Sequence, residues 1–302
     1  MESKDGRGLY DRFFNRLMFP IFDLQGRAIA FGGRVIEKGE PKYLNSPETA
    51  VFNKSKTLYG MNFAKAARKR EIILVEGYMD MISIYQAGFE NVVAGLGTAF
   101  NNDHARTLRK LAESVILLYD SDEAGTRAAL RAIPVLVNNG FEVRVTQVTG
   151  AKDADEFIKK YGSEAFGKLI IDAVSHITFR INCAKKNYNM DNAEHRVRFA
   201  EEAAKVLADV SSDIERDVYT KETAAVCGID ESALRSRITK IMDATEGEFL
   251  KEAEKKRKRV YSEKDSRDIR PKGIIEAQRM VLSLAAYNDR VLKSVFSVIN
   301  PD

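Results

Sequence analysis

Apolar strand-like runs and helix-like segments alternate strictly from Glu71 to Val148, and this alternation constrains the fold more than any other feature of the sequence. Four short apolar runs bounded by turn residues predict strands over 71–77, 91–97, 115–120 and 142–148. Repeated strand–helix units favour a mainly parallel sheet covered by helices on both faces, because parallel neighbours need a crossover connection. We therefore expect an α/β domain over residues 71–170.

Carboxylates gather where three of these predicted strands end. They are Glu76 and Asp80 after the first strand, Asp120 and Asp122 after the third, and Asp153 and Asp155 after the fourth. Ligands of open α/β sheets bind beyond the carboxyl ends of the strands, so we expect the acids to surround one crevice. Crowded carboxylates repel one another unless a divalent cation neutralises them, and an all-oxygen set favours magnesium or manganese over zinc. The alternative is that Asp122 or Asp153 only N-caps the helix that follows.

The segment before this domain is basic. Residues 1–70 hold 14 Lys and Arg against 7 Asp and Glu, a net +7, whereas residues 71–170 hold 10 against 14, a net −4. A basic surface beside an acidic cluster suits a polyanion whose backbone is held while a metal centre acts on a phosphate. The competing interpretation is that both blocks are solvated faces.

The sequence also predicts the structure of the segments before and after this α/β domain. Residues 17–36 predict a β-meander, followed by an irregular loop, KGEPKYLNSPET, that its prolines keep out of regular structure. Helical spacing after Asp153 predicts a helical bundle over 171–250. A polar linker is expected over 251–272, and an amphipathic pattern resumes over 273–302.

The composition excludes several classes of protein. No apolar run approaches the length of a bilayer span, and the first residues have no secretion signal, so we expect a cytoplasmic protein without a membrane partner. The two cysteines, Cys183 and Cys227, stand singly and support neither a disulfide framework nor a zinc site.

Two sets of motifs resemble a known family. VEGYMD at 75–80 and YDSD at 119–122 resemble the TOPRIM signature, a glutamate and then DxD, which primases, topoisomerases and some nucleases share. Upstream, DRFFNRLMFPI, FGGRV, PKYLNSPET and FNKSKTLYG resemble the catalytic domain of bacterial DnaG-type primases, and topoisomerases do not carry the KYLNSPET block. The resemblance runs from Leu9 to Phe166. It implies a TOPRIM-type mainly parallel sheet, preceded by a small mixed α/β basic subdomain over 1–70 and followed by the helical bundle.

Matched position by position, the resemblance also implies the site. Catalytic metal ligands would be Glu76, Asp120 and Asp122, with the acidic site completed by Asp80, Asp153 and Asp155. Template or nucleotide phosphates would be held by a basic ridge of Arg34, Lys42, Tyr43, Asn45 and Lys54. The physical logic agrees, because Lys and Arg neutralise phosphates and a tyrosine can stack on an unpaired base.

The implied enzyme is a DNA-directed RNA polymerase, a nucleotidyltransferase that makes RNA primers from NTPs on a single-stranded DNA template with Mg²⁺ or Mn²⁺. The replicative helicase is the expected partner, through a C-terminal domain that would begin at 273–287 and be cut short. Ser121 and Ala154 replace the usual glycine and proline of the two DxD motifs, and neither change removes a ligand. The family's zinc ribbon and an additional catalytic subdomain have no counterpart here, so no zinc is expected.

Two alternatives stay open. A TOPRIM nuclease or topoisomerase would use the same acids to cleave DNA, although nothing in the sequence identifies the transesterifying tyrosine that a topoisomerase needs. The second alternative is a non-catalytic module that binds single-stranded DNA or a helicase. Such a module gains nothing from acids beside its phosphate-binding ridge.

Overall fold

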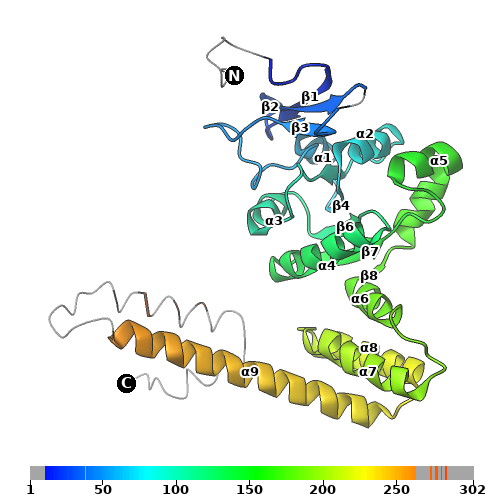
Figure 1. Cartoon of the computed structure of the whole chain (residues 1–302), viewed down its shortest axis with the longest axis vertical. Coiled ribbons are helices and arrows are strands. Elements are labelled where there is room, and N and C mark those ends of the chain that lie inside the picture. The colour runs from blue at the N-terminus through cyan, green and yellow to red at the C-terminus, as the bar shows by residue number, and fades with distance from the viewer. Residues whose placement is uncertain are drawn as a thin grey trace. The chain divides into compact units, whose positions relative to one another are not determined.

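The computed structural model describes residues 11–37 and 39–262, together with 273, 276, 277, 280 and 283. Between 248 and 262 it describes the backbone alone. The chain divides into two compact units, residues 1–235 and 236–302. Every predicted site residue belongs to the first unit, whose elements can be followed in Figure 1.

A small antiparallel sheet forms the N-terminal part of the first unit. Its strands, in spatial order, are β1 (Arg16–Phe22), β2 (Ala28–Val35) and β3 (Tyr43–Asn45). The strands β1 and β2 confirm the predicted meander. The expectation of an irregular loop after this meander was wrong in part. Three of the loop residues form β3, which pairs with β2 from Gly32 to Arg34. Pairing is possible because the three residues of β3 lie between the prolines and keep their own N–H groups.

The second sheet has five strands in the order β5-β4-β6-β7-β8. They are β4 (Glu71–Val75), β5 (Val92–Ala94), β6 (Ser114–Leu118), β7 (Glu142–Thr146) and β8 (Val174–Ser175). The first four run parallel, and β8 pairs antiparallel with β7 at the edge. The predicted mainly parallel sheet is therefore confirmed. Because β4, β6 and β7 are parallel neighbours, their carboxyl ends meet at one edge of the sheet.

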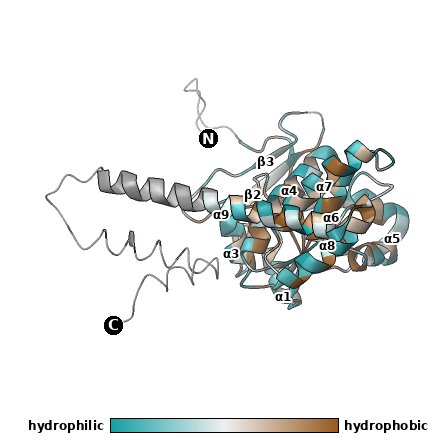
Figure 2. Ribbon diagram, turned by 90° about the horizontal axis from the view of Figure 1, so that it is seen from below, coloured by the Kyte–Doolittle hydropathy of each residue, from teal (hydrophilic) through white to brown (hydrophobic). Residues whose placement is uncertain are grey.

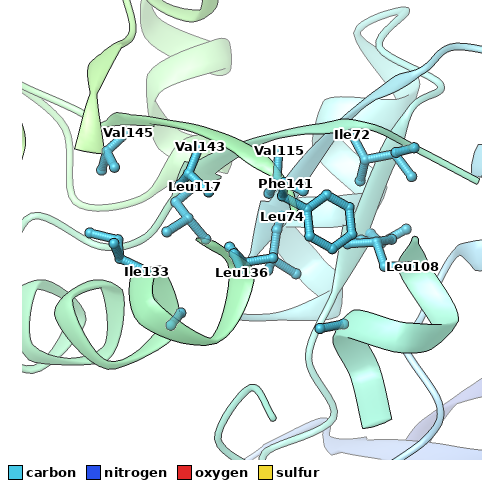
Figure 3. Packing of buried hydrophobic residues seen from close by; sticks show 14 of the residues in the cluster. Ile72, Leu74, Leu108, Val115, Leu117, Ile133, Leu136, Phe141, Val143 and Val145 are labelled. Atoms are coloured by element: carbon cyan, nitrogen blue, oxygen red, sulfur yellow. The ribbon is translucent and has the colours of Figure 1, made fainter. Parts of the chain in front are cut away.

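Helices cover both faces of this sheet, as predicted. Ile72 and Leu74 of β4 pack on the face that α3 (Asn102–Leu108) and α4 (Glu123–Asn138) cover, which Figure 3 shows. Ile73 and Val75 of β4 pack on the opposite face, which α2 (Tyr78–Gln86) and α5 (Ala154–Ile171) cover. Full burial of each Ile or Leu side chain stabilises the fold by about 1.5–3 kcal/mol. The sheet is thus a firmly packed base for the residues that follow its strands.

The remaining described helices are α1 (Met61–Ala67), α6 (His176–Lys185), α7 (Ala193–Ala208), α8 (Asp213–Cys227) and α9 (Glu231–Ser262). Phe199 of α7 and Cys227 of α8 are fully buried in a shared core. Figure 2 shows that hydrophobic and hydrophilic residues alternate along these helices. Within the described residues, no helix combines the length and apolarity that a bilayer crossing requires.

Two expectations for the C-terminal half need correction. The stretch over 171–250, expected to be a helical bundle, is not helical throughout, because β8 adds a short strand to the sheet edge. The linker expected over 251–272 is helical as far as Ser262, because its Lys, Glu, Ala and Arg residues favour a helix. Residues 263–272, and nearly all of 273–302, lie outside the described residues. The helicase-binding helix expected there stays a prediction.

Candidate functional site

Glu76 and Asp120 are two predicted ligands that the structure brings into direct contact. Glu76 follows β4 and Asp120 follows β6, and the backbone N–H of Asp120 donates to Oε1 of Glu76 at 3.2 Å. Burial and the charge of Asp120 raise the pKa of Glu76. Burial and the charges of Asp122 and Asp153 raise the pKa of Asp120. The ends of three neighbouring strands therefore place like charges within electrostatic reach of one another.

Asp80 lies on the first turn of α2 and faces the same group of acids. Burial, followed by the charges of Asp120 and Asp153, raises the pKa of the Asp80 carboxyl to about 7. The side chain of Asp80 approaches the backbone at Gly77, where a Cβ would lie 3.3 Å from Oδ2. Burial and the neighbouring carboxylates therefore disfavour the negatively charged form of Asp80.

Asp122 and Asp153 both cap helices, as the alternative interpretation of the sequence expected. The Oδ1 of Asp122 accepts a hydrogen bond from the N–H of Gly125 at 2.7 Å, at the start of α4. The Oδ1 of Asp153 accepts one from the N–H of Glu156 at 2.9 Å, at the start of α5. A carboxylate has a second oxygen, so capping does not prevent either residue from binding a cation.

Asp155 differs from the other five acids because both of its oxygens bind side chains. Ser83 of α2 donates to Oδ1, and the ammonium of Lys159 lies 2.6 Å from Oδ2. Burial raises the pKa of Asp155, but these two hydrogen bonds, together with the charges of Lys159 and Arg34, outweigh burial and leave the pKa below its ordinary value. Asp155 therefore links α2 to α5, and the structure gives it a tethering contact that the sequence did not predict.

The acids fit a hard divalent cation by their chemistry. In the part of the chain that the structure describes, no three His, Cys, Asp or Glu side chains stand close enough to hold a metal ion as they lie. The donors are all carboxylate oxygens, and their mutual repulsion contributes to the raised pKa values of Glu76, Asp80 and Asp120. A bound divalent cation would relieve that repulsion. The metal ligands remain a prediction.

Gly125 is a site residue that sequence reasoning missed. A Cβ at this position of α4 would lie 2.3 Å from the backbone oxygen of Asp120 and 2.7 Å from Oε1 of Glu76. The close approach of the two strand ends therefore depends on the missing side chain. The available signal was a glycine three residues after Asp122 in the first turn of a predicted helix, where glycine is otherwise unfavourable.

Two cations near the acids were also missed. The charge of Arg131, on α4, lowers the pKa of Glu76, and the charge of Lys152 lowers that of Asp120. Neither cation outweighs burial and repulsion, since both carboxyl groups keep raised pKa values. No spacing in the sequence marks either residue.

Arg34, Lys42 and Tyr43 of the predicted ridge lie together on the small sheet. Arg34 and Tyr43 face each other across β2 and β3. The Arg34 guanidinium carbon lies 5.7 Å and the Lys42 nitrogen 5.6 Å from the centre of the Tyr43 ring, which is 38% exposed. Arg34 and Lys42 also line a hollow of about 630 Å³, together with Leu17, Val35, Ile36, Glu37, Gly39 and Glu40.

Asn45 and Lys54 have structural contacts besides their predicted role. The Nδ2 of Asn45 donates to the backbone oxygen of Leu96 at 2.8 Å and so joins the small sheet to the loop after β5. The backbone oxygen of Lys54 lies 2.6 Å from Nε2 of His104, a fully buried residue of α3. Burial lowers the pKa of His104, and since the carbonyl oxygen of Lys54 can only accept, Nε2 carries the proton and donates. The sequence offered no signal for His104 beyond its place on a helix.

The basic ridge and the acids lie within electrostatic reach of each other. Burial raises the pKa of Tyr43, Arg34 opposes this, and the charges of Asp80 and Asp153 add to it. Arg34 in turn helps to lower the pKa of Asp155. Cations on one sheet thus stand beside carboxylates at the edge of another.

A Toprim-like family model matches residues 73–158, so the parallel sheet and its strand-end acids define a TOPRIM-type domain. Residues 1–65 match the model of the N-terminal domain of the DNA primase catalytic core. Residues 177–232 match the model of the DnaB-helicase binding domain of primase. This last match covers α6 to α8, whereas the sequence had suggested a helicase-binding segment after residue 273.

The crystal structure of a DNA primase domain from Pseudomonas aeruginosa is similar to this chain at 35% identity and a TM-score of 0.66, covering 79% of this chain and 76% of that one. A DnaG primase catalytic domain bound to single-stranded DNA matches at 36% identity and a TM-score of 0.64, over 74% of this chain and 73% of that one. A DNA primase of Clostridium acetobutylicum is 44% identical over 77% of this chain and 39% of its own length.

The chain belongs to the DNA primase family, as the sequence motifs predicted. It spans about two fifths of the length of the curated relatives that it matches.

Proposed function

We propose that this chain carries the polymerising centre of a primase, which joins ribonucleotides on single-stranded DNA. In the proposed reaction, the 3′-hydroxyl of one nucleotide attacks the α-phosphate of an incoming NTP, and pyrophosphate leaves. The observation that carries the proposal is the meeting of two features: carboxylates from three parallel strand ends, and a basic ridge within their electrostatic reach. A phosphate chain held on the ridge would present its reacting groups to the acids.

The side chains of the ridge would have separate roles in binding. Arg34 and Lys42 would hold backbone or triphosphate oxygens, and Tyr43 would offer a partly exposed ring to a base. The hollow beside Arg34 and Lys42 gives room for a nucleotide. Lys54 would extend the ridge, and the His104 hydrogen bond would fix the loop that carries it.

The proposed cofactor is Mg²⁺, with Mn²⁺ as its substitute. The residues that would hold it are Glu76, Asp80, Asp120, Asp122 and Asp153, with Asp155 at the margin. When bound, such ions supply charge stabilisation of the phosphates and activation of the attacking hydroxyl. Glu76 would also be placed to accept a proton, since burial keeps its pKa raised.

A replicative helicase is the proposed protein partner. The match to a helicase-binding model supports a contact through α6 to α8. Ile214 and Val218, one turn apart on α8, are 79% and 47% exposed, which gives this helix an apolar strip for a partner. A contact through residues 273–302 remains a second location for the same role.

The test of the proposed activity is primer synthesis on single-stranded DNA with NTPs and Mg²⁺. The wild-type chain should extend RNA, and Glu76→Ala and Asp120→Ala should lower the rate by about a hundredfold or more, the scale of losing a group that stabilises transition-state charge. Asp103→Ala is the matched control, because Asp103 is an acid on α3 whose partner is Arg106. Full activity in both site variants would refute the assignment.

The same assay separates the alternatives. Cleavage of labelled DNA without any RNA product would identify a TOPRIM nuclease instead of a polymerase. Binding of DNA that needs no metal, with no product from any mixture of nucleotides, would identify a non-catalytic module.

A further inference from the structure

Tyr78 occupies the junction between the small sheet and the TOPRIM domain. It is the first residue of α2, two positions after Glu76 and two before Asp80. Its side chain is only 5% exposed. The motif around Tyr78 stands out in the sequence for its acids, and no role was predicted for the tyrosine itself.

Three aromatic rings surround the Tyr78 ring. Phe19 of β1 lies 5.0 Å away between ring centres, Tyr43 of β3 lies 5.2 Å away, and Tyr59 lies 5.4 Å away. The Tyr43 contact is edge-to-face, with 78° between the ring planes. Such pairs contribute about 0.5–1.5 kcal/mol each beyond the area that they bury. The Tyr78 ring is therefore held by both outer strands of the small sheet.

The middle strand makes room for Tyr78. A Cβ on Gly32 of β2 would lie 3.3 Å from the Tyr78 hydroxyl and 3.1 Å from Oδ1 of Asn45. Glycine thus lets the backbone of the sheet approach the tyrosine closely. All three strands of the small sheet contribute to the surface on which Tyr78 packs.

The ring, and not the hydroxyl, carries the contact. Among the described residues the Tyr78 hydroxyl has no hydrogen-bond partner, although it is buried. Burial, followed by the neighbouring Tyr43 and Tyr59, raises its pKa to about 12, so it stays protonated. Removing the hydroxyl would cost no hydrogen bond that the described structure contains.

We propose that Tyr78 is a positioning residue that sets the basic ridge against the acidic side chains. On one side its ring holds Tyr43, which lies beside Arg34 and Lys42. On the other side its backbone begins the helix that carries Asp80 and the Ser83 that binds Asp155. Loss of the ring would let the ridge shift relative to the acids without removing any group that binds phosphate or metal. A small misplacement of reacting groups is costly, since about 1 Å can lower a rate a hundredfold.

The experiment compares Tyr78→Leu, Tyr78→Phe and Phe63→Leu. Phe63→Leu is the control, because Phe63 of α1 lies at ring distances of 6.5 Å from Phe22 of β1 and 5.2 Å from Tyr85 of α2, neither of which belongs to the ridge or to the acids. Primer synthesis gives kcat, and the anisotropy of labelled single-stranded DNA without divalent metal gives the affinity of the ridge. Thermal unfolding shows how far each variant is destabilised.

Tyr78→Leu should lower kcat about tenfold or more while the metal-free DNA affinity changes by less than about threefold, since the ridge itself is intact. Tyr78→Phe should restore kcat to within about twofold, and Phe63→Leu, which also removes an aromatic ring from an interlocking cluster, should leave kcat within the same range. A loss of DNA affinity as large as the loss of kcat, an equal loss of kcat in Tyr78→Phe, or an equal loss in Phe63→Leu would each overturn the proposal. The inference rests on the proposed polymerase activity, and a wild-type chain that makes no primers would refute that activity without bearing on the metal-free DNA affinity.

Discussion

The backbone N–H of Asp120 donates a hydrogen bond to Oε1 of Glu76 and so joins the ends of two neighbouring parallel strands. This bond partly offsets the repulsion between the two carboxylates, because it lowers the pKa of Glu76 while burial and the Asp120 charge raise it. The contact also fixes which oxygen of Glu76 faces the backbone. The geometry of the acidic group therefore depends on backbone positions as well as on the acids themselves.

Replacing Gly125 with alanine should disrupt this contact. Alanine normally stabilises a helix by about 0.5–1 kcal/mol relative to glycine. At position 125 the new Cβ would meet Asp120 backbone and the Glu76 carboxylate, so we expect a loss of about 1–3 kcal/mol and a strong loss of activity. Gly167→Ala in α5, where the nearest atom is 3.4 Å from the added Cβ, should be neutral or stabilising. Urea unfolding measures both, and a stabilised Gly125→Ala would contradict the prediction.

Asp122→Ser separates helix capping from cation binding. Serine is as good an N-cap as aspartate, so the unfolding free energy should change by less than about 0.5 kcal/mol, whereas Asp122→Ala should lose about 1 kcal/mol. Both variants lack the carboxylate, so both should lose primer synthesis if Asp122 binds the cation. An active Asp122→Ser would show that the aspartate serves only as a cap.

The salt dependence of DNA binding should report the basic ridge. Each contact between a cationic side chain and single-stranded DNA contributes about 0.7 to the slope of log affinity against log salt. Arg34→Ala or Lys42→Ala should reduce the slope by about that amount. Lys205→Ala, which removes the same charge from the exposed face of α7, should leave the slope unchanged. Equal slopes in all four proteins would exclude the ridge as the phosphate contact.

The stability of the fold should fall in mild acid because of His176. Burial, followed by the charge of Arg180, lowers the pKa of His176 to about 4, against an ordinary value of 6.5. Between these two pH values the unfolded chain binds a proton that the folded chain does not. Stability contributed by the neutral ring is therefore complete above pH 6.5 and is lost as the pH falls toward 4.

Urea unfolding at pH 7, 5.5 and 4.5 measures this effect. The wild-type protein should lose more stability over that range than His176→Gln, which has no titrating ring. Parallel loss in both proteins would assign the acid sensitivity to other groups. His104, whose pKa burial also lowers, acts in the same direction and is present in both proteins.

The sheet and the acids were predictable because their signals are local. The apolar runs that became β4, β6 and β7 are short and bounded by turns, and a parallel arrangement places whatever follows them at one edge. Glu76 and Asp120 could thus be brought together from sequence alone. The strand β3 was missed because flanking prolines and only three pairing residues resemble a loop.

Contacts between distant residues were not predictable. The bond from Asn45 to Leu96 and the bond between His104 and Lys54 depend on how the small sheet lies against the larger one. Tyr78 was hidden for the same reason, since its three ring partners come from separate segments of the chain. The alternation and spacing of apolar residues indicate on which face of a strand or helix a residue lies. They do not indicate which distant residue contacts it on that face.

If the strand-end acids share a divalent cation, the protein should bind Mn²⁺ through them. Titration followed by electron paramagnetic resonance, in which free Mn²⁺ gives the signal, should show saturable binding by the wild-type chain. Asp120→Asn should abolish that binding, while Asp103→Asn, which alters an acid on α3, should preserve it. Wild-type binding that survives unchanged in Asp120→Asn, or a wild-type chain that binds no Mn²⁺, would refute a shared cation at this edge of the sheet.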